Sequence, residues 1–133
     1  MENYFGWKSL FLLGAALLFA GCKPADSGSF SGARAFAETE ALVQISPRDA
    51  GTAKARIAAV HLETQLKDLG FKTVIDTFSE ETPAGKIFFN NVLGRLPGKT
   101  NRLILLVSHF DTKTGISPEF QGANDSGSSS GVL

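Results

Sequence analysis

The chain contains very little cysteine and no excess of charge of either sign. Its 133 residues include a single cysteine, Cys22, so an intramolecular disulfide is impossible. The 13 lysines and arginines balance the 13 aspartates and glutamates, and no basic cluster stands out. Because phosphate backbones are bound by concentrated positive charge, we expect no nucleic-acid partner. The remaining classes of partner are small molecules and peptides.

The hydrophobic run near the amino terminus is too short for a transmembrane helix. It covers residues 10–20, about half of the ~20 residues that such a helix needs, which favours a secretion signal. Residues 19–22 resemble a bacterial lipoprotein processing box, so we expect a signal peptide over residues 1–22 and lipidation of Cys22. The alternative is an ordinary thiol after a conventional signal. With Lys23 next to the anchor, we expect an exported lipoprotein of the cell envelope, at the outer membrane or facing the periplasm.

Local signals predict two helices behind a tether. Residues 23–32 are rich in Ser, Gly and Pro, which is typical of a flexible linker. Residues 33–45 are predicted to form a helix that the following proline ends. Residues 52–69 place apolar side chains at helical spacing, and Gly70 is the stop signal. We interpret His61 as a residue of the helix surface.

Aliphatic, β-branched and aromatic residues then predict three strands. The first two cover residues 71–78 and 86–96 and are joined by the turn-rich segment 79–85. The third contains five consecutive aliphatic residues, 103–107, the pattern of a central strand buried on both faces of a parallel or mixed sheet. With a new helix expected near Gly127, we predict an α/β fold, a three-layer sandwich around a mixed, largely parallel sheet.

Polar side chains follow the third strand, at the edge where open α/β sheets collect ligands. His109 and Asp111 are two residues apart, so both side chains lie on one side of an extended chain. A neutral imidazole can bind zinc through one nitrogen while the other donates to a carboxylate that fixes its tautomer. Asp125 could supply an oxygen ligand to the same ion, so we expect His109 and Asp125 to approach within metal-sharing distance. The alternative is a polar strand end without a metal.

Two motifs together carry a resemblance to a known family. HFDT at the end of an aliphatic strand, followed after a loop by FQGANDSGSSSG, resembles the zinc exopeptidases of metallopeptidase family 28, which include bacterial leucyl aminopeptidases and glutaminyl cyclases. The resemblance implies that residues 33–133 are the amino-terminal part of a zinc peptidase-like catalytic domain. It also implies that His109 binds one zinc, that Asp125 bridges two, and that Asp111 orients His109.

The resemblance makes further predictions about the loop around Asp125. Gly122 and Gly127 would let the backbone pass close to the metal site, whereas simple loop flexibility is the alternative. The bond between Asp125 and Ser126 is expected to be cis, turning the carboxylate toward the metal. Asn124 and the serines from Ser126 onward are interpreted as loop and helix-cap residues.

Three functions are compatible with these residues. The favoured one is a zinc-dependent exopeptidase of the aminopeptidase type, in which one or two zinc ions activate the peptide bond of a peptide substrate. The second is a glutaminyl-peptide cyclotransferase with one zinc, in which the histidine of the motif need not bind metal. The third is a binding lipoprotein without catalysis. The family's general base and later ligands cannot be assigned within residues 1–133, so we expect a truncated domain that is inactive alone.

Overall fold

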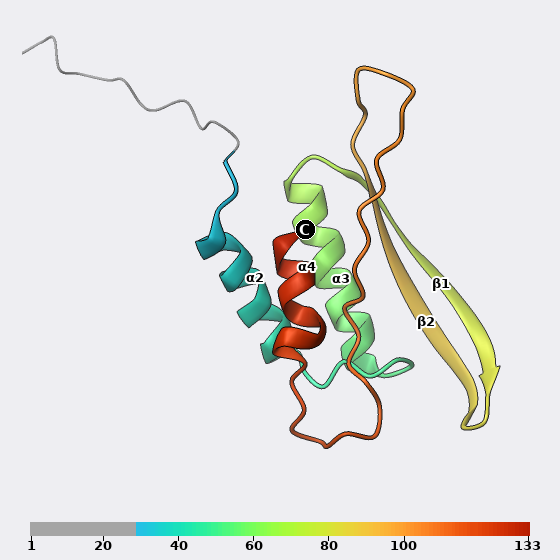
Figure 1. Cartoon of the computed structure of the whole chain (residues 1–133). Coiled ribbons are helices and arrows are strands. Elements are labelled where there is room, and N and C mark those ends of the chain that lie inside the picture. Colours follow the sequence, from blue (N-terminus) through green and yellow to red (C-terminus); the bar gives the residue numbers. More distant parts are fainter. Residues whose placement is uncertain (1–28) are drawn as a thin grey trace, which may run out of the picture. The chain divides into compact units, whose positions relative to one another are not determined.

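The computed structural model describes residues 29–133, of which Ser31–Leu133 form one unit. The predicted signal peptide, the lipidation site at Cys22 and most of the predicted tether therefore lie outside the described residues. No helix in the described part is long and apolar enough to cross a membrane. The elements that follow are those that position the candidate site (Figure 1).

Helix α2 (Gly32–Gln44) begins at a serine cap. The hydroxyl oxygen of Ser31 accepts a hydrogen bond from the backbone N–H of Arg34 at 3.3 Å, which satisfies one of the free N–H groups of the first turn. The helix expected over residues 33–45 is confirmed. Its buried side chain is Leu42.

Helix α3 (Ala53–Asp68) begins at a threonine cap and ends at a glycine. The hydroxyl oxygen of Thr52 accepts a hydrogen bond from the N–H of Ala55 at 3.1 Å. Gly70, just beyond the helix, has a φ of +86°, the left-handed conformation that ends many helices and favours glycine. The predicted helix and its stop signal are both confirmed. The buried residues of α3 are Ala55, Ala58 and Ala59.

Strands β1 (Lys72–Thr82) and β2 (Gly85–Arg95) form a two-stranded antiparallel sheet. Phe78 lies opposite Phe89, and the two rings stack with their centroids 5.3 Å apart. Helix α3 packs against both strands. The first two predicted strands are therefore confirmed as a hairpin.

The turn of this hairpin is shorter than predicted. We expected residues 79–85 to form the connection, but β1 continues through Thr82 and the turn contains only Pro83 and Ala84. The extension pairs Glu81 with Lys86 across the strands, and opposite charges facing each other stabilise an antiparallel pair. We interpreted the polar residues 79–82 as part of a turn, but they form the exposed end of β1.

The third predicted strand is absent from the structure, so this prediction was wrong. Residues 103–107 have no helix or strand conformation, and their side chains are 70–85% exposed. A central strand is buried only when strands pair on both of its edges and helices cover both faces, and within residues 29–133 the hairpin strands pair only with each other. The described residues therefore form helices and an antiparallel pair, and the three-layer parallel sandwich is not confirmed.

The last described segments are η1 (Ala123–Ser128), which is kinked at Asp125 and Ser126, and the short helix α4 (Ser129–Val132). Both pack against α2. The contact with α2 is close at Gly131, where an added Cβ would lie 2.4 Å from the carbonyl oxygen of Ala35. The helix expected near Gly127 is present, and this packing sets the position of the loop that carries Asp125.

Candidate functional site

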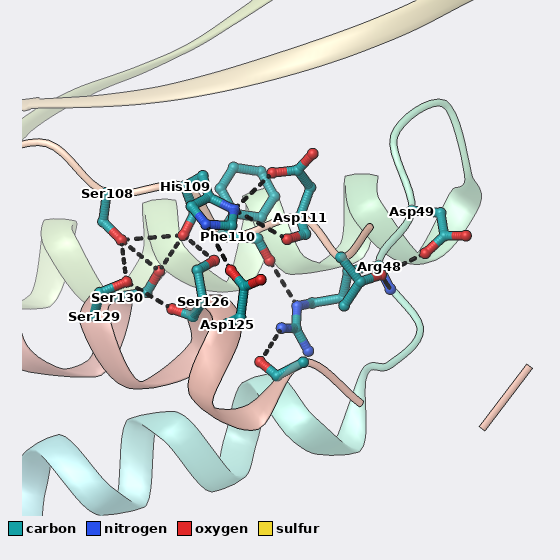
Figure 2. Close-up of polar contacts among 12 residues, drawn as sticks. Arg48, Asp49, Ser108, His109, Phe110, Asp111, Asp125, Ser126, Ser129 and Ser130 are labelled. Atoms are coloured by element: carbon teal, nitrogen blue, oxygen red, sulfur yellow. Dashed lines mark hydrogen bonds and ion pairs between the residues drawn. The ribbon is translucent and has the colours of Figure 1, made fainter. Parts of the chain in front are cut away.

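His109 lies between two carboxylates (Figure 2). Its Nε2 is 3.0 Å from Oδ1 of Asp125, and its Nδ1 is 3.3 Å from Oδ1 of Asp111. All three side chains remain accessible, with exposed fractions of 59% for His109, 69% for Asp125 and 44% for Asp111. The expected approach of His109 to Asp125 is therefore confirmed, as is the contact of His109 with Asp111.

The backbone of η1 presents Asp125 to the histidine. Asp125 has φ −112° and ψ 92°, and Ser126 also departs from helical values. The peptide bond between them is cis, as expected. Because the chain leaves helical geometry at this point, the Asp125 side chain reaches His109 from the start of a helical region that packs on α2.

Serine hydroxyls hold the backbone of His109. Its carbonyl oxygen accepts hydrogen bonds from Ser126 Oγ, from Ser130 Oγ at 3.0 Å and from Ser108 Oγ at 3.0 Å. Ser108 Oγ also lies 2.7 Å from Ser129 Oγ. The sequence interpretation of these serines as loop and cap residues missed this role. They connect the histidine segment to η1 and α4, and Ser126 is itself buried.

Arg48 is the residue that sequence reasoning overlooked. It is fully buried, with 0% of its surface exposed, although it lies in a segment that the sequence marked only as a helix breaker. Its guanidinium donates to backbone carbonyls at 2.7 Å (Phe110 and Leu42), 3.0 Å (Gln121) and 3.2 Å (Gly122). Burial lowers the pKa of Arg48 from its ordinary value, and the nearby negative charge of Asp111 opposes this shift. No sequence pattern signals this role, because the acceptors are backbone atoms.

A threonine completes the attachment of this segment to the segment that carries His109. Thr112 Oγ1 accepts a hydrogen bond from the backbone N–H of Arg48 at 2.8 Å and donates to Asp49 Oδ1. The N–H of Thr112 in turn donates to the carbonyl of Arg48 at 3.3 Å. Residues 48–49 and 112 thus form a small parallel bridge beside the site.

Gly122 is required by its surroundings. Its φ is +56°, and an added Cβ would lie 2.6 Å from Thr112 Cγ2 and 2.7 Å from the carbonyl oxygen of Asp125. Gly127 donates its N–H to the carbonyl of Gly122 at 2.9 Å. An added Cβ at Gly127 would lie 3.1 Å from the carbonyl oxygen of Gly122, so the backbone is closely packed at both glycines. The predicted passage of this backbone close to a metal stays a prediction.

His61 takes no part in the site. Its Nε2 lies 3.2 Å from Oε2 of Glu38, which links α3 to α2. The side chain of His61 is 23% exposed, so the histidine expected at the helix surface lies partly buried between the two helices.

The donor set at His109 fits a zinc ion. An imidazole nitrogen and a carboxylate oxygen on one tetrahedral zinc lie about 3.4 Å apart, and Nε2 of His109 and Oδ1 of Asp125 are already 3.0 Å apart. The carboxylate of Asp111 contacts the other ring nitrogen, as outer carboxylates do for zinc-bound histidines. Residues 29–133 contain no group of three or more His, Cys, Asp or Glu side chains that could hold a metal ion. The described residues therefore supply part of a ligand set.

Comparisons with known proteins give one family match and several similar enzymes. Residues 91–133, which include His109, Asp111 and Asp125, match the family model described as Peptidase family M28. A protein of Drosophila melanogaster named glutaminyl-peptide cyclotransferase is 32% identical over 81 residues, which are 60% of this chain and 23% of that protein.

Solved structures of glutaminyl cyclases resemble this chain in fold. The enzyme of Porphyromonas gingivalis has a TM-score of 0.69 and 27% identity, over 77% of this chain and 36% of that one. The enzyme of Macrostomum lignano has a TM-score of 0.57 and 25% identity, over 84% of this chain and 36% of that one. The chain thus spans about a quarter of the curated relative and little more than a third of each structure.

Proposed function

Since the chain belongs to peptidase family M28, we propose that the whole protein is a zinc-dependent glutaminyl-peptide cyclotransferase. The observation that carries the proposal is the likeness to enzymes of this name both in sequence, at 32% identity, and in structure, at a TM-score of 0.69. Our first expectation favoured an aminopeptidase, and these likenesses support the cyclotransferase better.

The reaction joins two parts of one residue. The α-amino nitrogen of an amino-terminal glutamine attacks its own side-chain amide carbon, the bond to the amide nitrogen breaks, and ammonia leaves with the proton that the amine gives up. Zinc, when bound, would polarise the amide carbonyl as a Lewis acid. Asp125 would hold the ion, and the exposed position of its carboxylate leaves room for a peptide end.

His109 and Asp111 would act on the carboxylate rather than on the substrate. His109 Nε2 lies within hydrogen-bonding distance of Asp125, and Asp111 lies against Nδ1. A hydrogen bond from Nδ1–H to Asp111 would leave Nε2 unprotonated, ready to bind metal, whereas a proton on Nε2 would orient Asp125 as a ligand. The cyclotransferase proposal assigns His109 the second role.

A zinc exopeptidase is the second candidate. It is favoured by the match of residues 91–133 to a peptidase family and by the proximity of His109 to Asp125, which suits two ligands of one ion. In that enzyme His109 would be a metal ligand and a peptide bond would be hydrolysed. The two candidates therefore assign different roles to the same imidazole.

One experiment separates the candidates. The full-length protein is incubated with a glutaminyl peptide and, separately, with an aminoacyl anilide, and ammonia and aniline are measured. We expect ammonia release that a chelator abolishes and zinc restores, with no aniline. We also expect partial loss of activity in His109→Ala and complete loss in Asp125→Ala. Aniline release with complete loss in both variants would instead establish the exopeptidase, and neither product would refute both.

Export and membrane attachment are further proposals about the whole protein. The short hydrophobic run at residues 10–20 and the lipoprotein-like box ending at Cys22 support them. A lipid anchor at Cys22 would place the catalytic unit at the cell envelope, where it would meet exported peptides.

A further inference from the structure

One buried guanidinium joins the two segments that carry the candidate site. Arg48 Nε donates to the carbonyl of Phe110, the residue between His109 and Asp111. Its terminal nitrogens donate to the carbonyls of Gln121 and Gly122, at the start of the loop that leads to Asp125. Figure 2 shows the guanidinium between these two segments.

The same group is anchored to the rest of the fold. Arg48 Nη1 also donates to the carbonyl of Leu42 at 2.7 Å and to Ser46 Oγ. Leu42 is the buried residue of α2, and α2 packs against η1 and α4. The guanidinium therefore links both loops to helix α2.

The chemistry of arginine suits this task. A guanidinium is planar and carries five N–H donors in a fixed fork, so each bonded carbonyl is held in direction as well as in distance. Hydrogen bonds from a charged donor are shorter and stronger than neutral ones. A buried charge is tolerated only when its donors are satisfied, and here backbone carbonyls satisfy them. Lysine would provide the charge without the fork.

We propose that Arg48 is the positioning residue that fixes the separation of His109 and Asp125, by fastening the carbonyls of Phe110, Gln121 and Gly122 to one guanidinium. The proposal rests on the proposed zinc site for its functional meaning. It makes the affinity for zinc depend on Arg48, whose guanidinium donates to backbone carbonyls and not to the side chain of His109 or Asp125. A merely structural arginine would lower stability and leave the affinity of the folded protein unchanged.

Two variants of Arg48 test the proposal in the full-length protein. Arg48→Met removes the charge and all of its donors, and Arg48→Lys keeps the charge but loses the fork. If Arg48→Met fails to fold, Arg48→Lys carries the test. Arg56→Lys, at an exposed position of α3, is the matched control for the substitution itself. Ala58→Gly, at a buried position of α3, is the control for lost stability.

The first measurement is amide hydrogen exchange in the metal-free protein. The N–H groups of Thr112 and Gly127 are hydrogen-bonded to the carbonyls of Arg48 and Gly122, so they report on the two loops, and amides of the β1–β2 hairpin are the reference. We expect these two amides to exchange at least about tenfold faster in both Arg48 variants, since neither methionine nor lysine offers the fork of donors that holds the three carbonyls. An unchanged rate, or one that rises equally in the hairpin, would overturn the proposal.

The second measurement is the dissociation constant for zinc, by competition with a chromophoric chelator. Outer groups that orient ligands typically change metal affinity by about 10–100-fold, and we expect a rise of this size in the Arg48 variants and none in Arg56→Lys or Ala58→Gly. An equal rise in Ala58→Gly would mean that the effect is lost stability. If the unmodified protein binds no zinc, the proposed function fails, and the exchange rates still decide whether Arg48 positions the loops.

Discussion

At the scale of single residues, the contact of His109 with Asp111 is the simplest to test. Asp111→Ala removes the carboxylate that lies 3.3 Å from Nδ1 of His109, so the imidazole loses the contact that orients its ring. We expect the turnover of glutaminyl peptide by the full-length protein to fall by about 10–100-fold. Glu119→Ala, an exposed carboxylate of the same loop, should leave turnover unchanged. Equal losses in the two variants would mean that general charge, and not orientation, is responsible.

Gly122 offers a residue-scale prediction about stability. Alanine at this position would adopt a left-handed φ and bring its Cβ within 2.6 Å of Thr112 Cγ2, and conformations of this kind cost of order 1–3 kcal/mol. We expect Gly122→Ala to lower the free energy of unfolding by at least that amount in urea titrations. Gly98→Ala, whose Cβ would lie 4.0 Å from the carbonyl oxygen of Thr100 and whose φ is not positive, should change it little. A neutral Gly122→Ala would contradict the close approach described above.

At the scale of elements, the aliphatic run at residues 103–107 has a measurable signature. In the chain of residues 1–133, Leu105 is 76% exposed and Leu42 is fully buried. We therefore expect Leu42→Ala to lower the free energy of unfolding by about 2–5 kcal/mol and Leu105→Ala by less than about 0.5 kcal/mol. Comparable losses in thermal or urea unfolding would show that this segment is packed.

Whether the sequence predicted an element depended on how local the cause was. Helix α3 was predicted because Gly70 and the spacing of apolar residues act within a few positions, and the end of α2 because Pro47 follows it closely. The run at residues 103–107 was misassigned because burial on two faces depends on neighbouring strands, which a local pattern cannot supply. The turn was misplaced because the pairing of β1 with β2 continues as far as Thr82 and Gly85, which a local polar composition does not reveal.

In the candidate site, too, some residues were predicted from the sequence and one was missed. His109 and Asp111 were singled out because they are two residues apart, and Asp125 because its loop resembles that of the family; the structure brings the three side chains together. Arg48 was missed because its partners are backbone carbonyls as far as 74 positions away. Their alignment is a product of the fold, and a residue type alone does not predict it.

At the scale of the whole molecule, the proposed anchor can be tested directly. Metabolic labelling with a radioactive fatty acid should mark the unmodified protein and leave Cys22→Ser unlabelled, since Cys22 is the only thiol of the 133 residues. The unmodified protein should also sediment with membranes, from which Cys22→Ser is released. Equal labelling of the two proteins would refute lipidation.

The hydrogen bonds of Arg48 also set an order of events during synthesis. They join positions separated by 62, 73 and 74 residues, and closing such long loops loses chain entropy before any contact compensates for it. On a ribosome, α2, α3 and the hairpin emerge before Phe110, so the guanidinium stays solvated while these elements form. It can be desolvated only after Gly122 has left the exit tunnel. The geometry around His109 is therefore among the last parts of residues 29–133 to form, and a nascent chain that has not yet exposed residues 120–128 has no assembled site with which to bind metal.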